Sequence, residues 1–145
     1  MPDIHEKRVC LYPPPSGILA GMRPNWTELS RTALAEVQTL IRSLPREIRA
    51  QAESLAVLLE QRPPKALINE GIAADTLGIF EGPSLRDSDG GATTPPHIIL
   101  YLANLWDFSR PDVKLYRAEI RTTYLHELGH YLGLDESDLE ARALD

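Results

Sequence analysis

The sequence predicts a compact α+β domain with two main helices and a small sheet, the second helix lying near the C-terminus. Two segments, residues 25–44 and 112–132, repeat apolar residues at spacings of three and four, the period of a helix with one buried side. Three shorter apolar runs, at residues 54–60, 77–80 and 98–102, have the length and composition of strands.

The first helix is predicted to begin at Asn25, which together with Glu28 forms the pattern of an N-terminal capping pair. The apolar residues that then recur on one face are Leu29, Ala33, Val37, Leu40, Ile41 and Leu44. Pro45 ends this helix, and it also fits the first position of a shorter helical segment over residues 45–52.

The second helix is predicted over residues 112–132. Residues 109–112 supply Ser and Asp side chains that can accept hydrogen bonds from first-turn amides, and a proline that suits an initial turn. The predicted apolar stripe consists of Ala118, Thr122, Leu125, Gly129 and Leu132, widened by Leu128. Gly133 can adopt the left-handed conformation that ends a helix.

The string HELGH, residues 126–130, lies on this helix. Residues four apart share a helix face, so His126 and His130 can reach one metal ion, with Glu127 one step round the helix. Each histidine alone would more simply be an ordinary surface or core residue, and Glu127 alone a solvated one. The combined pattern favours a zinc site of a hydrolase.

A catalytic zinc normally has three protein ligands and one open position. A turn at Gly133 would send the acidic segment that follows back toward the histidines, and a ligand three residues after such a glycine is a known spacing. Glu136 occupies that position and is the preferred third ligand; Asp135 and Asp138 are the alternatives. An acidic surface turn with no metal role is the simpler interpretation of the same residues.

The chemistry of such a site follows from charge. Zinc lowers the pKa of a bound water to about 7 and polarises the scissile carbonyl. A nearby carboxylate can take the proton of the water and pass it to the leaving amine, and Glu127 is the candidate for this general base.

Three stretches resemble the small bacterial minimal zincin-like metallopeptidase family. They are LGIFEGPSL at residues 77–85, PPHIILYLANLWDF at 95–108 and RTTYLHELGHYLGLDESDL at 121–139. The resemblance covers about the last 120 residues. It implies a compact α+β domain that binds zinc through His126, His130 and Glu136, with Glu127 as the catalytic residue, although the family more often has Asp at the third ligand position.

The resemblance also implies that a strand beside the metal binds substrate by adding the peptide backbone to the edge of the sheet. Residues 98–102 are the candidate strand, with a buried core strand as the alternative. His97, Tyr124 and Tyr131 are possible donors to an anionic intermediate, and His97 is also a possible metal ligand. A surface role for His97 and packing roles for both tyrosines are the simpler expectations.

Composition fits one small globular domain, with 43% hydrophobic and 25% charged residues. The net charge is −6 and the basic residues form no stripe, so no nucleic-acid partner is expected. The apolar run at residues 18–20 is far too short to cross a bilayer, and no membrane partner is expected. The lone Cys10 and the absence of an apolar leader favour a cytoplasmic location.

The predicted organisation is a Pro/Gly-rich extension over residues 1–24 and a zincin-like domain over residues 25–145. Residues 82–96 are rich in Gly, Pro, Ser, Thr and Asp, and are expected to form a surface loop that connects strands or covers the cleft.

The predicted function is therefore hydrolysis of peptide bonds in a peptide or protein substrate by a zinc-activated water, with Zn²⁺ as cofactor. One alternative is a narrow regulatory peptidase that cuts a single protein partner. Another is a non-catalytic zinc-binding interaction module, which the presence of Glu127 disfavours because a structural site needs no base.

Overall fold

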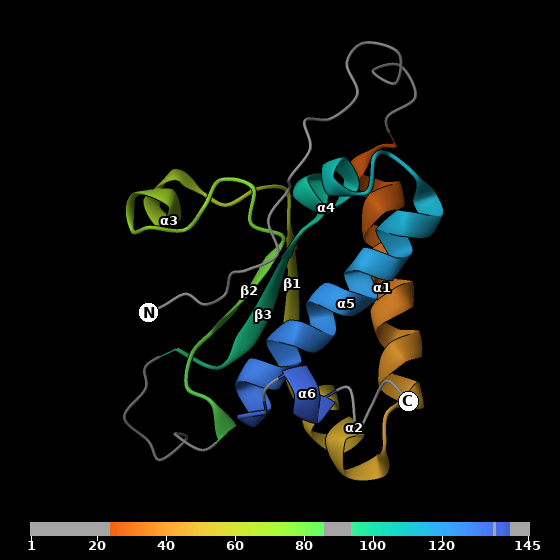
Figure 1. The fold of residues 1–145 in the computed structure, drawn as a ribbon, viewed down its shortest axis with the longest axis vertical. Helices are drawn as coiled ribbons and strands as arrows, with labels where there is room; N and C mark the ends of the chain where they lie inside the picture. The colour runs from red at the N-terminus through yellow and green to blue at the C-terminus, as the bar shows by residue number, and fades with distance from the viewer. Residues whose placement is uncertain (1–23, 86–93, 135, 140–145) are drawn as a thin grey trace.

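The structure is a computed structural model and describes residues 24–85, 94–134 and 136–139 (Figure 1). Its elements, in chain order, are α1 (Trp26–Ser43), α2 (Arg46–Glu53), β1 (Ala56–Glu60), α3 (Lys65–Asn69), β2 (Gly78–Glu81), β3 (His97–Tyr101), α4 (Leu102–Phe108), α5 (Val113–Leu132) and α6 (Glu136–Leu139). The predicted α+β class is confirmed, including a long helix near the C-terminus.

The three strands form one sheet in the order β1-β3-β2. β3 runs parallel to β1, with Ile99 opposite Leu58, and antiparallel to β2, with Ile99 opposite Ile79. The expectation that residues 98–102 offer a free edge is therefore wrong, because the backbone of β3 is hydrogen-bonded on both sides. Among the strands that the structure describes, the one beside α5 with a sheet neighbour on one side only is β2.

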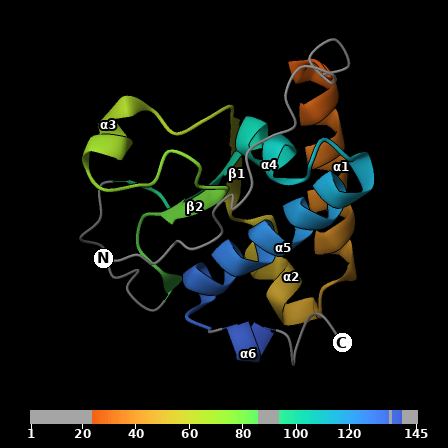
Figure 2. The same cartoon turned by 45° about the horizontal axis from the view of Figure 1, so that its top comes forward.

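α5 packs across one face of the sheet, and α1 lies on the far side of α5 from the strands (Figures 1 and 2). The main core fills the space between these layers. It includes Leu29, Ala33, Val37 and Leu40 from α1, Ile98 and Leu100 from β3, and Tyr116, Ile120, Tyr124 and Leu128 from α5. Burial of these side chains is the main force that holds α5 at a fixed position on the sheet.

The opposite face of the sheet is covered by the segment that contains α3. This segment lies on the other side of the strands from α5 (Figure 1). Leu67 and Ile72 pack there against Ile79, Ile99 and Tyr101. Because side chains alternate along a strand, His97, Ile99 and Tyr101 face this side, whereas Ile98 and Leu100 face α5.

The N-terminal helix forms as its sequence predicts. The Asn25 side chain accepts a hydrogen bond from the Glu28 amide at 2.9 Å, and the Glu28 side chain accepts one from the Asn25 amide at 3.3 Å. These bonds satisfy first-turn donors that have no partner within the helix. Pro45 is the N-cap of α2, so the predicted break and the second helical segment are both confirmed.

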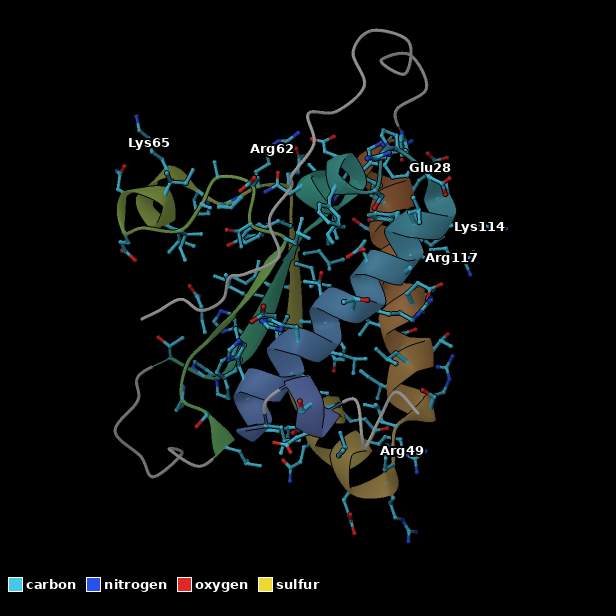
Figure 3. All side chains as sticks on the ribbon, in the orientation of Figure 1. Glu28, Arg49, Arg62, Lys65, Lys114 and Arg117 are labelled. Carbon is cyan, nitrogen blue, oxygen red and sulfur yellow. The ribbon has the colours of Figure 1, made fainter. Side chains whose placement is uncertain are left out.

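Helix α4 is a feature that the sequence prediction missed. Asn104 in α4 donates hydrogen bonds to the carbonyl oxygens of Ala74 at 2.9 Å and Thr76 at 2.8 Å, and it accepts one from Arg62 at 2.6 Å. Arg62, which lies beside α4 (Figure 3), also forms an ion pair with Asp107 at 3.1 Å. This network ties the α3 side of the sheet to the helix that precedes α5.

Several sequence predictions fall outside the described residues. They are the N-terminal extension except Pro24, the lone Cys10, and residues 86–93 of the predicted loop. The division into an extension and a domain therefore stays a prediction. Within the described part of the chain, no helix is both long enough and apolar enough to pass through a membrane.

Candidate metal centre

The two histidines lie in the last two turns of α5, and both ends of this helix are formed by the residues that the sequence indicated. The Asp112 side chain is the N-cap and accepts a hydrogen bond from the Leu115 amide at 3.2 Å. Gly133 ends the helix in the left-handed conformation, with φ of 75°. α5 is thus a continuous 20-residue helix that carries the whole HELGH string.

The buried side of α5 differs from the predicted stripe. Leu125, Leu128 and Gly129 are buried as expected, but Thr122 is exposed and Ala118 is only partly buried. The helix instead buries a wide arc that includes Tyr116, Ile120, Thr123, Tyr124 and Tyr131. The reason is that α5 lies between α1 and the sheet, so two sides of it are covered rather than one.

His126 and His130 direct the same ring nitrogen toward one point. Their Nε2 atoms are 3.4 Å apart, and their rings are nearly perpendicular, at 84°. Zinc–nitrogen bonds of about 2.0–2.1 Å at a tetrahedral angle place two ligand nitrogens about 3.3 to 3.4 Å apart. The observed separation of 3.4 Å therefore matches the spacing that a single zinc ion requires of two nitrogen ligands.

Glu127 completes a cluster of three potential ligand groups whose atoms all lie within 4.8 Å of one another. Its side chain is fully buried, and Oε2 lies 3.9 Å from Nε2 of His126. A buried carboxylate is costly unless positive charge lies close by, and a divalent cation held by the two imidazoles would supply that charge. The donor set thus fits zinc.

The predicted third ligand is not tested by the structure. After Gly133 the chain turns and enters α6, which packs against α5 and begins at Glu136. Asp135 and the Glu136 side chain are outside what the structure describes, and the exposed Asp138 is not part of the three-residue cluster. The turn brings the acidic segment to the C-terminal end of the helix that carries the histidines.

Strand β2 runs alongside the part of α5 that carries the cluster. At one end, Gly78 lies against Thr123, so closely that a Cβ atom on residue 78 would be 2.8 Å from the Thr123 methyl group. At the other end, the ring of Phe80 packs against the ring of Tyr131 at a centroid distance of 5.7 Å. β2 and β3 both contact α5, and of these two strands β2 is the one at an edge of the described sheet.

An ion-pair cluster links α5 to α1; its carboxylate, from Glu36, is buried, and its two arginines are exposed. Glu36 of α1 accepts hydrogen bonds from Arg117 at 2.6 Å and from Arg121 at 2.7 Å. Figure 3 shows Arg117 projecting from α5 beside α1. Burial acts to raise the pKa of Glu36, but the two guanidinium groups outweigh burial and hold this pKa below its ordinary value.

Two further candidates, His97 and Tyr124, have environments of their own. His97 is more enclosed than expected for a surface histidine: its Nε2 is 3.0 Å from Glu81 Oε1 and its Nδ1 is 2.9 Å from the Pro95 carbonyl oxygen. It also belongs to the sheet face opposite α5, so it is not a ligand of this cluster. Tyr124 is fully buried in the core, and burial raises the pKa of its phenol.

Glu36 and Thr123 were missed by the sequence analysis. Glu36 could have been found, because it falls between Ala33 and Leu40 on the apolar face of the first helix, where a charged residue requires a buried partner. The sequence did not single out Thr123, since this residue lies outside the apolar stripe predicted for the second helix.

The fold and the cluster together define an α+β scaffold in which one helix carries two imidazoles and a buried acid that could hold a metal ion. The family model described as zincin-like metallopeptidase matches residues 52–144, which is more than half of the chain, and the chain belongs to this family. No curated protein matches the chain.

Proposed function

We propose that this protein is a zinc-dependent peptidase that hydrolyses peptide bonds in a peptide or protein substrate. The observation that carries the proposal is the 3.4 Å separation of the His126 and His130 Nε2 atoms beside the buried carboxylate of Glu127. Membership of the zincin-like metallopeptidase family supports the same class of reaction.

His126 and His130 would hold the metal, and Glu136 is the proposed third ligand because of its place after Gly133. A zinc ion held there would lower the pKa of a water molecule and polarise the carbonyl group of the substrate. Glu127 then acts as the general base: its carboxylate takes a proton from the attacking water and later gives it to the leaving amine. Its burial beside His126 keeps the carboxylate within reach of the reacting atoms.

An extended peptide can be bound by the backbone of β2. β2 pairs with β3 along one side, and within the described residues no strand pairs with its other side. Backbone hydrogen bonds to such an edge hold a peptide in register without requiring a particular sequence. The contacts of Gly78 with Thr123 and of Phe80 with Tyr131 keep this strand beside the metal-binding turns of α5.

The direct test is cleavage of a peptide library by the zinc-loaded protein, followed by mass spectrometry. Wild type is expected to cut peptides, and Glu127→Gln is expected to retain zinc but to lose at least about 100-fold in kcat, because the base is removed while the metal ligands remain. Equal cleavage by both proteins would refute the proposal. Cleavage confined to one sequence would favour the narrow regulatory role over a broad specificity.

A further inference from the structure

Thr123 combines complete burial with a hydroxyl group that has no hydrogen-bond partner among the described residues. Two other buried hydroxyls of the described residues are satisfied locally: Ser109 donates to the Leu105 carbonyl at 2.7 Å, and Thr76 donates to the Ala73 carbonyl at 2.7 Å. A buried polar group without a partner lowers stability, and valine would fill nearly the same volume without this cost. A functional role explains why a hydroxyl occupies this position.

The helix places Thr123 one turn before Glu127. Residues four apart lie on the same face, and side chains in a helix lean toward its N-terminus, so the Glu127 side chain lies over the turn that carries Thr123. Both Glu127 oxygens and the Thr123 hydroxyl are shielded from solvent. Bulk solvent therefore does not compete for a hydrogen bond between these two groups.

Three other buried hydroxyls also lack a partner among the described residues, those of Ser30, Tyr101 and Tyr124. Ser30 lies in α1, and Tyr101 faces the opposite side of the sheet. Tyr124 is near Glu127 in sequence, but its long ring leans away toward the N-terminus of α5 and carries its oxygen into the core. Thr123 is therefore the member of this group placed to act on the catalytic carboxylate.

We propose that Thr123 is a positioning residue for Glu127, donating a hydrogen bond from its Oγ1 to the carboxylate in the active enzyme; this inference rests on the proposed function. The Thr123 methyl group is packed against Gly78, so the bond forms through a change in the side-chain torsions of Glu127. The hydrogen bond would hold one carboxylate oxygen in place and leave the other oriented toward the water that it activates.

The first test of this pairing does not depend on turnover. Urea midpoints of the zinc-loaded protein are measured for wild type, Thr123→Val, Glu127→Gln and the double variant. The midpoint shift caused by Thr123→Val should differ between the Glu127 and E127Q backgrounds, because a hydrogen bond to a carboxylate is stronger than one to an amide. Identical shifts in both backgrounds would overturn the proposal.

The second test is kinetic. Thr123→Val should lower kcat by about tenfold or more while KM stays within about twofold, because a hydrogen bond to a charged group is lost at the base and not at the substrate. Thr123→Ser, which keeps the hydroxyl, should restore most of kcat. An unchanged kcat in Thr123→Val would overturn the positioning role. If wild type cleaves no peptide, the proposed function fails, and the urea experiment still decides whether the two side chains are coupled.

Discussion

Gly78 of β2 and Thr123 of α5 are in contact across the interface between the edge strand and the helix that carries the histidines. A Cβ atom on residue 78 would lie 2.8 Å from Cγ2 of Thr123 and 3.0 Å from the carbonyl oxygen of Ile99. One neighbour is a branched side chain in the core and the other is sheet backbone, so neither can move easily. The absence of a side chain at residue 78 thus sets how closely α5 approaches the sheet.

Gly78→Ala is expected to lower the free energy of unfolding by about 1 to 3 kcal/mol, because the added methyl group overpacks this interface. Urea denaturation monitored by circular dichroism measures the effect. Combining it with Thr123→Ala, which removes the nearest methyl group, should recover part of the loss. An alanine tolerated at residue 78 without loss of stability would show that the helix and strand are not in such close contact.

The Glu36 cluster predicts a pH-dependent stability. In the folded protein the pKa of Glu36 is below its ordinary value of 4.5. The ionised Glu36 carboxylate therefore contributes stability above about pH 4.5, and this stability is lost as the pH falls through the folded-state pKa. Glu36→Gln should lower the free energy of unfolding at pH 7 by about 1 to 3 kcal/mol, between values typical of exposed and buried pairs.

The measurement is the urea midpoint of wild type and Glu36→Gln at a series of pH values from 7 to below 4. The difference between the two proteins should shrink toward acidic pH, because protonation removes the charge that the variant already lacks. Glu70→Gln, at an exposed position, is the matched control and should change little at any pH. A difference that stays constant with pH would contradict the assigned ion pairs.

The sequence predicted the helices with strong end signals well. Asn25, Asp112 and Gly133 all act at the helix ends as their residue types indicate, because capping depends on residues close together in the chain. Helix α4 was missed because LANLWDF follows the strand HIILY without a break in apolar character. Local periodicity cannot separate a short buried helix from the end of a buried strand.

The candidate site was predicted in part. The convergence of His126, Glu127 and His130 followed from helical spacing alone, and the structure brings these three together. The edge strand was assigned wrongly because strand order depends on pairing between distant segments, which a single sequence does not reveal. The same limit concealed the pairing of Glu36 with Arg117 and Arg121, more than 80 residues along the chain.

Gly133 offers a test of how the chain returns toward the histidines. Gly133→Ala should cost about 1 to 2 kcal/mol because a left-handed backbone is unfavourable for residues with a Cβ atom. It should also weaken zinc binding, because the turn directs the acidic segment toward the cluster. Gly71, with φ of 111° and open space around it, is the control: Gly71→Ala should reduce stability but leave zinc affinity unchanged. Equal zinc affinity in both variants would show that the turn at Gly133 does not contribute to zinc binding.

The third ligand can be identified by comparing three single substitutions, Asp135→Asn, Glu136→Gln and Asp138→Asn. Each removes one negative charge from the same segment, so a general electrostatic effect should be alike in all three. Loss of a ligand should weaken zinc binding much further, by about 100-fold or more, and this loss is expected for Glu136→Gln. A larger loss for either aspartate variant would transfer the role to that residue.

The account depends most directly on zinc held by the imidazoles of His126 and His130. Competition with a chromophoric chelator should show one zinc bound per wild-type chain and an affinity weaker by about 100-fold or more in His126→Ala and His130→Ala. His97→Ala, on the opposite face of the sheet, should bind zinc as wild type does. Failure of wild type to bind zinc more tightly than the double variant H126A/H130A would contradict the proposed metal centre.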